Sequence, residues 1–132
     1  MKTLATVLLT AFTAFTLACG YSSKPTTPAT AGSLPTITIL APTNATHGDP
    51  AFVLMVTGTN FSTTAVINFN GVAETTNQVS ATQLTATIPA SQIETAGTVQ
   101  VTITNPAVAG TGAYGSGGTL AETSVPMNFT VD

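Results

Sequence analysis

The stretch that decides the fold is FVLMVTGTNFSTTAVINFNG, residues 52–71. In its first half Phe52, Leu54 and Val56 fall on one face of an expected strand, because successive side chains of a strand point to opposite faces. Gly58 ends the run. Glycine tolerates a positive φ, so we expect Gly58 to provide the sharp exit from the strand. The stretch therefore begins with a half-buried strand that leads into a corner.

The corner is Gly58-Thr59-Asn60-Phe61, and a second strand follows it. We interpret Phe61 as a core residue that fixes the corner rather than as an exposed binding anchor, because buried aromatic side chains contribute strongly to core stability. Ile67 and Phe69 then share a face, and Asn70-Gly71 follows them. This dipeptide predicts a hairpin, since a type I′ turn needs positive φ at both central residues.

Composition favours an all-β domain and argues against nucleic-acid binding. Only 5% of the 132 residues are charged and 43% are hydrophobic, with many β-branched side chains. Both lysines, Lys2 and Lys24, precede the expected domain, and the sequence has no arginine. A nucleic-acid binder needs clustered cations to displace counterions from phosphates. We therefore expect no nucleic-acid partner.

Residues 1–18, MKTLATVLLTAFTAFTLA, have the pattern of a signal peptide, in which a lysine precedes an apolar run that ends in a small residue. The only cysteine, Cys19, follows at once. Thr16-Leu17-Ala18-Cys19 resembles the bacterial lipobox, which implies cleavage before Cys19 and lipid on its sulfur. A single cysteine cannot form an internal disulfide, so the alternative to lipidation is a small buried or free thiol in an ordinary secreted protein. We expect export and lipid anchoring to the bacterial cell envelope, with the membrane as a partner through Cys19.

The rest of the chain divides into a linker and one domain. Residues 19–33 begin with the lipidated cysteine and continue as a flexible linker rich in Ser, Thr, Pro and Gly. Residues 34–132 contain short alternating strands separated by turn residues, which predicts an immunoglobulin-like β-sandwich of about seven strands. Residues 72–78 read as an edge strand, residues 90–95 as one helical turn, and residues 107–124 as a long mobile loop. The side chains expected to face the core are Ile37, Ile39, Phe52, Leu54, Val56, Phe61, Ile67, Phe69, Leu84, Ala86, Ile88, Val99, Val101, Ile103, Met127, Phe129 and Val131.

Residues 34–132 also resemble the IPT/TIG domain, an immunoglobulin-like fold. The resemblance lies in PTITILAPTNATHGDPAFVLMVTGTNF, VINFNGV, VSATQLTATIPASQI, TAGTVQVTITNP and MNFTV. The Gly-Thr-Asn-Phe corner and the strand Gln-Leu-Thr-Ala-Thr-Ile-Pro are its most specific parts. The resemblance implies a module without catalytic residues that serves adhesion, spacing, or contact with proteins or sugars. Two features depart from the family pattern: the long loop of residues 107–124, and the apolar side chains of Val53 and Met55 at outward positions.

Candidate catalytic and metal-binding residues do not cluster in the sequence. His47 is the only histidine, and with Asp49 it would supply two ligands where a metal site needs three or four, so we interpret it as a solvated loop residue. No Ser or Thr has an identifiable base to activate it as a nucleophile. We therefore expect no catalytic residues, no metal and no cofactor.

These patterns predict a non-enzymatic, lipid-anchored cell-envelope module for protein interaction, adhesion or structural spacing. The alternative is a carbohydrate-binding surface module. The candidate interaction residues are Val53 and Met55, which face outward if Phe52 faces the core, and Tyr114 in the long loop. Tyr114 and Tyr21 are the candidate aromatic platforms for a sugar. The expected partner is an unidentified envelope protein or glycan.

Overall fold

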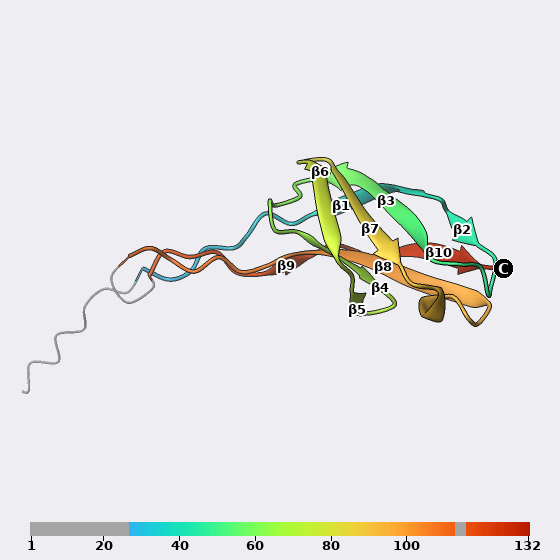
Figure 1. Cartoon of the computed structure of the whole chain (residues 1–132). Coiled ribbons are helices and arrows are strands. Elements are labelled where there is room, and N and C mark those ends of the chain that lie inside the picture. The colour runs from blue at the N-terminus through green and yellow to red at the C-terminus, as the bar shows by residue number, and fades with distance from the viewer. Residues whose placement is uncertain (1–26, 113–115) are drawn as a thin grey trace, which may run out of the picture.

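The computed structural model describes residues 27–112 and 116–132. Two β-sheets pack face to face, and a narrow arm projects from one end of the sandwich (Figure 1). The C-terminus lies at the other end. Within the described residues, no helix has the length and hydropathy needed to cross a membrane. The predictions for Cys19, Tyr21 and Tyr114 lie outside the described residues.

The first sheet has four antiparallel strands in the order β1-β3-β7-β6. They are β1 (Thr36–Ala41), β3 (Phe52–Thr59), β7 (Gln83–Ile88) and β6 (Thr76–Ser80). The central pair is in continuous register from Phe52↔Ile88 to Thr57↔Gln83. Residues that are paired across these two strands therefore point their side chains to the same face of the sheet.

The second sheet has the order β2-β10-β8-β4-β5, and a short additional strand, β9, also pairs with β8. Its strands are β2 (Asn44–Ala45), β10 (Met127–Val131), β8 (Gly97–Asn105), β4 (Val66–Phe69), β5 (Val72–Ala73) and β9 (Glu122–Thr123). β2 runs parallel to β10, and the other pairs are antiparallel. This arrangement confirms the predicted immunoglobulin-like sandwich.

Two short segments carry the chain from one sheet to the other. After β1, across the cis peptide bond Ala41–Pro42, β2 joins the second sheet. Residues 72–78, expected as one edge strand, are divided: β5 is the edge of the second sheet and β6 the edge of the first. The expected helical turn is the 3₁₀ helix η1 (Ala90–Gln92), and Ile93 beyond it is fully buried.

The core lies between the sheets and has an aromatic centre. The Phe129 ring packs against Phe52 with ring centroids 5.6 Å apart and meets Phe69 edge-on at 5.3 Å. Edge-on and offset ring pairs add about 0.5–1.5 kcal/mol beyond the burial of their area. Of the side chains expected to face inward, all but one are buried or packed against the buried cluster.

The exception is Ile39, whose predicted burial is wrong. Its side chain is 57% exposed, whereas Leu40 is 3% exposed. The register with β3 shifts between Ile37 and Ile39, so Thr38 is an extra residue on β1. A β-bulge of this kind leaves one residue unpaired and reverses the alternation beyond it.

The corner forms for a reason that differs from the predicted one. Gly58 lies inside β3, and the positive φ falls on Asn60 (φ 61°) instead. Gly58 is required for space: a Cβ there would collide with the carbonyl oxygen of Thr36 and lie 2.6 Å from Cζ of Phe61. Phe61 is 5% exposed, as predicted for a core residue. The predicted Asn70-Gly71 turn is confirmed, with φ of 52° and 79°.

Residues 107–124 were expected to form a mobile loop, but in the described part of this segment residues 107–112 and 116–121 belong to an arm and Glu122–Thr123 form β9. We define the arm as residues 27–33, 106–112 and 116–121. Thr119 is paired on both sides, antiparallel with Val108 and parallel with Thr30. The backbone N–H of Thr30 donates to Gly118 O at 2.9 Å, and that of Leu120 donates to Thr30 O at 2.9 Å. The three segments therefore form a ribbon that continues beyond the sandwich (Figure 1).

Glycine permits the close spacing of these arm segments. A Cβ on Gly32 would lie 2.5 Å from the carbonyl oxygen of Leu120, and one on Gly118 would lie 2.7 Å from the amide nitrogen of Gly110. In the sequence these glycines were interpreted as part of a flexible segment. In the structure they allow neighbouring backbone segments of the arm to approach one another closely.

Candidate interaction surface

The outer face of the first sheet brings together the predicted interaction residues that the structure describes. Val53 is 59% exposed and Met55 is partly buried on the same face of β3. The bulge in β1 adds Ile39, which is 57% exposed, to this face. Sequence alternation could not place Ile39 here, because nothing in TITILA marks the bulge. We define the outer face by the residues that the strand register places on it: Ile39, Ala41, Val53, Met55, Thr57, Asn77, Gln83, Thr85 and Thr87.

This outer face is apolar at its centre and carries no charged side chain. The register sets Met55 between Ala41 and Thr85, and Val53 opposite Thr87. The side-chain amide of Gln83 lies 3.0 Å from the Met55 sulfur and positions it on the face. Met is flexible and polarisable, and it is enriched in surfaces that bind proteins. The surface can therefore lose its water without desolvating an ion.

The outer face of the second sheet is different in character. It presents Thr98, Gln100, Thr102 and Thr104 from β8. The Asn68 side chain donates to the hydroxyls of Thr102 and Thr104 at 3.4 and 3.0 Å. Its polar groups are thus partly satisfied within the sheet, and none of the exposed large apolar side chains among the described residues lies on its central strands β4 and β8. The first sheet is therefore the better candidate for contact with a protein.

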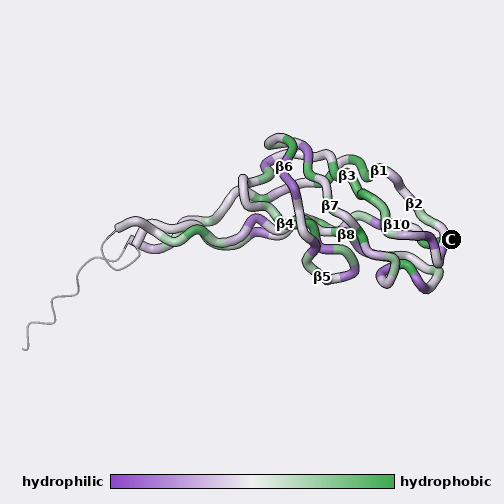
Figure 2. The backbone as a smooth tube through the Cα atoms, in the orientation of Figure 1, coloured by the Kyte–Doolittle hydropathy of each residue, from purple (hydrophilic) through white to green (hydrophobic). Residues whose placement is uncertain are grey.

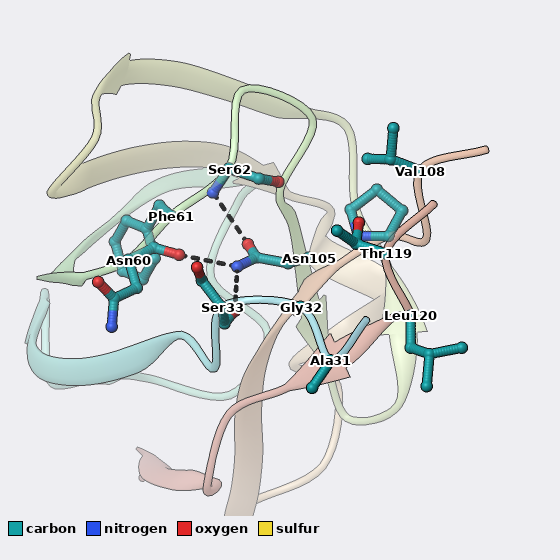
Figure 3. A pocket seen from close by; sticks show the side chains of 11 residues that line it. Ala31, Gly32, Ser33, Asn60, Phe61, Ser62, Asn105, Val108, Thr119 and Leu120 are labelled. Carbon is teal, nitrogen blue, oxygen red and sulfur yellow. Dashed lines mark hydrogen bonds between the residues drawn. The ribbon is translucent and has the colours of Figure 1, made fainter. Parts of the chain in front are cut away.

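A hollow of about 310 Å³ lies where the arm meets the corner (Figure 3). Asn105, which is 4% exposed, closes it at the end of β8. Its Nδ2 donates to the carbonyl oxygens of Ser33 and Asn60, both at 2.7 Å, and its Oδ1 accepts from the Ser62 N–H at 3.0 Å. One side chain thereby joins the arm, the corner and β8.

Sequence reasoning missed Asn105. A turn-forming residue before a proline, as in Asn105-Pro106, is normally read as the end of a strand and not as a structural centre. Of the polar atoms at the hollow, Ser62 Oγ is buried without a partner in the described residues. None of the described residues that line the hollow is charged or a histidine, so the lining offers no general base to activate a hydroxyl as a nucleophile.

The titratable groups of the sandwich are dispersed. His47 is exposed, and its Nδ1 lies 2.7 Å from the backbone oxygen of Asp132. The Asp49 carboxylate accepts from the Thr46 N–H at 3.2 Å. In the part of the chain that the structure describes, no three His, Cys, Asp or Glu residues lie close enough together to hold a metal ion.

The fold and this surface define an immunoglobulin-like module. A family model described as the IPT/TIG domain matches residues 35–121, which is more than half of the chain. The chain belongs to the IPT/TIG family. Domains of this family are typically non-catalytic and are used in protein interaction. No curated protein matches the chain.

Proposed function

We propose that the protein is a non-enzymatic, lipid-anchored module of the bacterial cell envelope, and that it binds another protein through the outer face of the first sheet. The observation that supports the binding site is the exposure of Ile39 and Val53, each more than half exposed, on either side of Met55. Burying a large aliphatic side chain completely is worth about 1.5–3 kcal/mol. Partial burial of these three side chains on a complementary surface is enough to place a binding hot spot at their centre.

The proposed face is tested with a pair of double variants. Ile39→Thr with Val53→Thr keeps β-branched residues in both strands and removes two apolar contacts. Val72→Thr with Val125→Thr is the matched control, because these valines are 49% and 78% exposed and lie away from the face. We expect the first variant alone to lose partners in cross-linking and pull-down from envelope extracts. Equal recovery of the same proteins by both variants would contradict the proposed site.

The proposed anchor rests on the position of Cys19 after Thr16-Leu17-Ala18. A lipobox cysteine carries a diacylglycerol, and two acyl chains hold a protein on a membrane where one chain binds only reversibly. Cells grown with an alkyne fatty acid should incorporate label into the wild type and not into Cys19→Ser. The same labelling in both proteins would exclude lipidation at this residue.

The carbohydrate-binding alternative lacks support in the described residues. Sugar-binding surfaces generally use exposed aromatic rings. The described residues contain four aromatic side chains, of which three are buried and Phe52 is partly buried against Phe129. An array of glycans probed with the wild type and with Tyr114→Ala tests the alternative directly. Binding that depends on Tyr114 would favour a sugar partner.

A further inference from the structure

The arm and the expected lipid anchor lie at the same end of the molecule. Because residues 27–33 run parallel to the strand that contains Thr119, Thr27 lies beside the hairpin end near Ser116 and not beside the sandwich. Figure 1 shows that the described chain begins at the free end of the arm, far from the C-terminus. The following inference rests on the proposed lipid at Cys19.

The chain between Cys19 and Thr27 is short. Residues 19–26 are eight residues, which span at most about 29 Å when fully extended. As a flexible coil they span about 16 Å r.m.s.. The polar headgroup region on each side of a bilayer is about 5–8 Å thick. A lipid on Cys19 would therefore hold the free end of the arm close to the membrane surface.

The arm also combines an absence of charged side chains in its described residues with exposed apolar side chains, as expected of a surface that contacts lipid. Its described residues include no Asp, Glu, Lys or Arg. Val108 and Leu120 are 57% and 53% exposed on it, and Figure 2 shows the hydrophobic stretch partway along the arm. About 10 Å of strand separates Thr119 from Ser116 near the free end. Val108 pairs directly with Thr119, so the side chains of Val108 and Leu120 lie on opposite faces of the ribbon (Figure 3). Both reach the headgroups when the arm enters the headgroup region end-on.

The charge of the sandwich favours the same orientation. Four of the five side-chain carboxylates, those of Asp49, Glu74, Glu94 and Asp132, belong to the sandwich, and the fifth, Glu122, lies at the base of the arm beside Gly32. Bacterial membranes that contain anionic lipid repel carboxylates within about a Debye length of the surface, about 8 Å at physiological salt. The free end of the arm, which is the end away from Glu122, is the part of the described structure that can approach such a surface with the least repulsion.

We propose that the arm is the membrane-facing element of the protein. Val108 and Leu120 contact the lipid headgroup region, and the sandwich stands off the bilayer with its C-terminal end outermost. The occupant of the arm's apolar surface is lipid, and not a protein partner. In this orientation the outer face of the first sheet does not face the membrane and remains accessible to a protein partner.

The test uses the lipoprotein purified from membranes and reconstituted in vesicles of phosphatidylethanolamine and phosphatidylglycerol that contain a headgroup-nitroxide lipid. Lipid on Cys19 occupies its sulfur, so one introduced cysteine is the only free thiol. A fluorophore is attached in turn to Val108→Cys, Leu120→Cys, Thr85→Cys on the outer face and Thr46→Cys near the C-terminal end. Every one of these positions is exposed except Thr85, which is partly exposed.

We expect strong quenching by the nitroxide lipid at positions 108 and 120 and quenching at the level of free solution at positions 85 and 46. Leu120→Asp should lower the quenching of the label at position 108, whereas Thr130→Asp on the sandwich should leave it unchanged. Circular dichroism of each variant checks that the sheets remain.

Three other results are informative. If mass spectrometry finds no lipid on Cys19, the proposed function fails and this inference fails with it. If the lipid is present but positions 108 and 46 are quenched equally, the inference alone is overturned. Capture of an envelope protein in cells by a photo-crosslinker at position 108, with no quenching of the fluorophore at that position in vesicles, would assign the arm to a protein partner and overturn the proposal as well.

Discussion

Replacing Asn105 with aspartate should destabilise the protein strongly although the side chain keeps its shape. The introduced carboxylate cannot donate to the carbonyl oxygens of Ser33 and Asn60, which Asn105 contacts at 2.7 Å. Two lost hydrogen bonds are worth about 1–3 kcal/mol. A charged carboxylate at a site that is 4% exposed adds a desolvation cost. We expect Asn105→Asp to lower the free energy of unfolding by about 2–4 kcal/mol.

Urea unfolding followed by circular dichroism measures this change, with Asn128→Asp on the exposed side of β10 as the control. The control should stay within about 0.5 kcal/mol of the wild type. Burial and the two carbonyl oxygens raise the pKa of the introduced carboxyl above its ordinary value near 3.9. The loss of unfolding free energy relative to the wild type is therefore complete above the raised pKa and becomes smaller as the pH falls through it.

The same substitution should release the N-terminal segment of the arm. Amide exchange at Thr30 and Leu120 should become faster, because Asn105 no longer holds Ser33. Two results would refute the reasoning: a loss of stability no larger than that of Asn128→Asp, or a deficit that does not depend on pH.

Other substitutions test the corner, the hairpin and the bulge. Phe61→Ala should cost about 3–5 kcal/mol in urea unfolding, since the ring is buried; a cost below about 0.5 kcal/mol would place the ring at the surface. Gly58→Ala should destabilise more than Gly71→Ala, because a Cβ at Gly58 collides with backbone, whereas at Gly71 the space is open and the cost is the positive φ, about 1–2 kcal/mol. Leu40→Ala should lower the free energy of unfolding by about 2–5 kcal/mol and Ile39→Ala by less than about 1 kcal/mol. A larger loss for Ile39→Ala than for Leu40→Ala would contradict the bulge.

Most of the fold could be predicted from the sequence because it depends on local patterns. The alternation in β3, β7 and β8 has the period of the strand, and Asn70-Gly71 carries its own backbone preference. Ile39 was misplaced because a bulge in a strand leaves no mark on the side-chain pattern. Gly58 was interpreted through its backbone freedom, whereas the contacts that require it come from Thr36 on another strand and from Phe61.

The candidate site was less predictable than the fold. Val53 and Met55 could be placed outward from alternation alone, but their neighbour Ile39 depends on the bulge. The arm could not be predicted, because its pairing joins Thr30 to Thr119 across most of the chain and its residues have no apolar period. Contacts of such long sequence separation are set by the completed sandwich and not by local preference.

The parallel pairing at Thr30 also determines how the protein would bear a mechanical load. Tension between a membrane-held N-terminus and a partner on the sandwich would pull residues 27–33 lengthwise along the neighbouring strand. The hydrogen bonds of Thr30 with Gly118 and Leu120, and that of Asn105 with Ser33, would then be sheared together rather than opened one at a time. Beyond them the chain continues into β1, which is held to β3 by its own ladder of hydrogen bonds. The hydrogen bonds of the arm would therefore resist the tension before it reaches the first sheet. β1, which helps to form the proposed binding face, would carry the same tension.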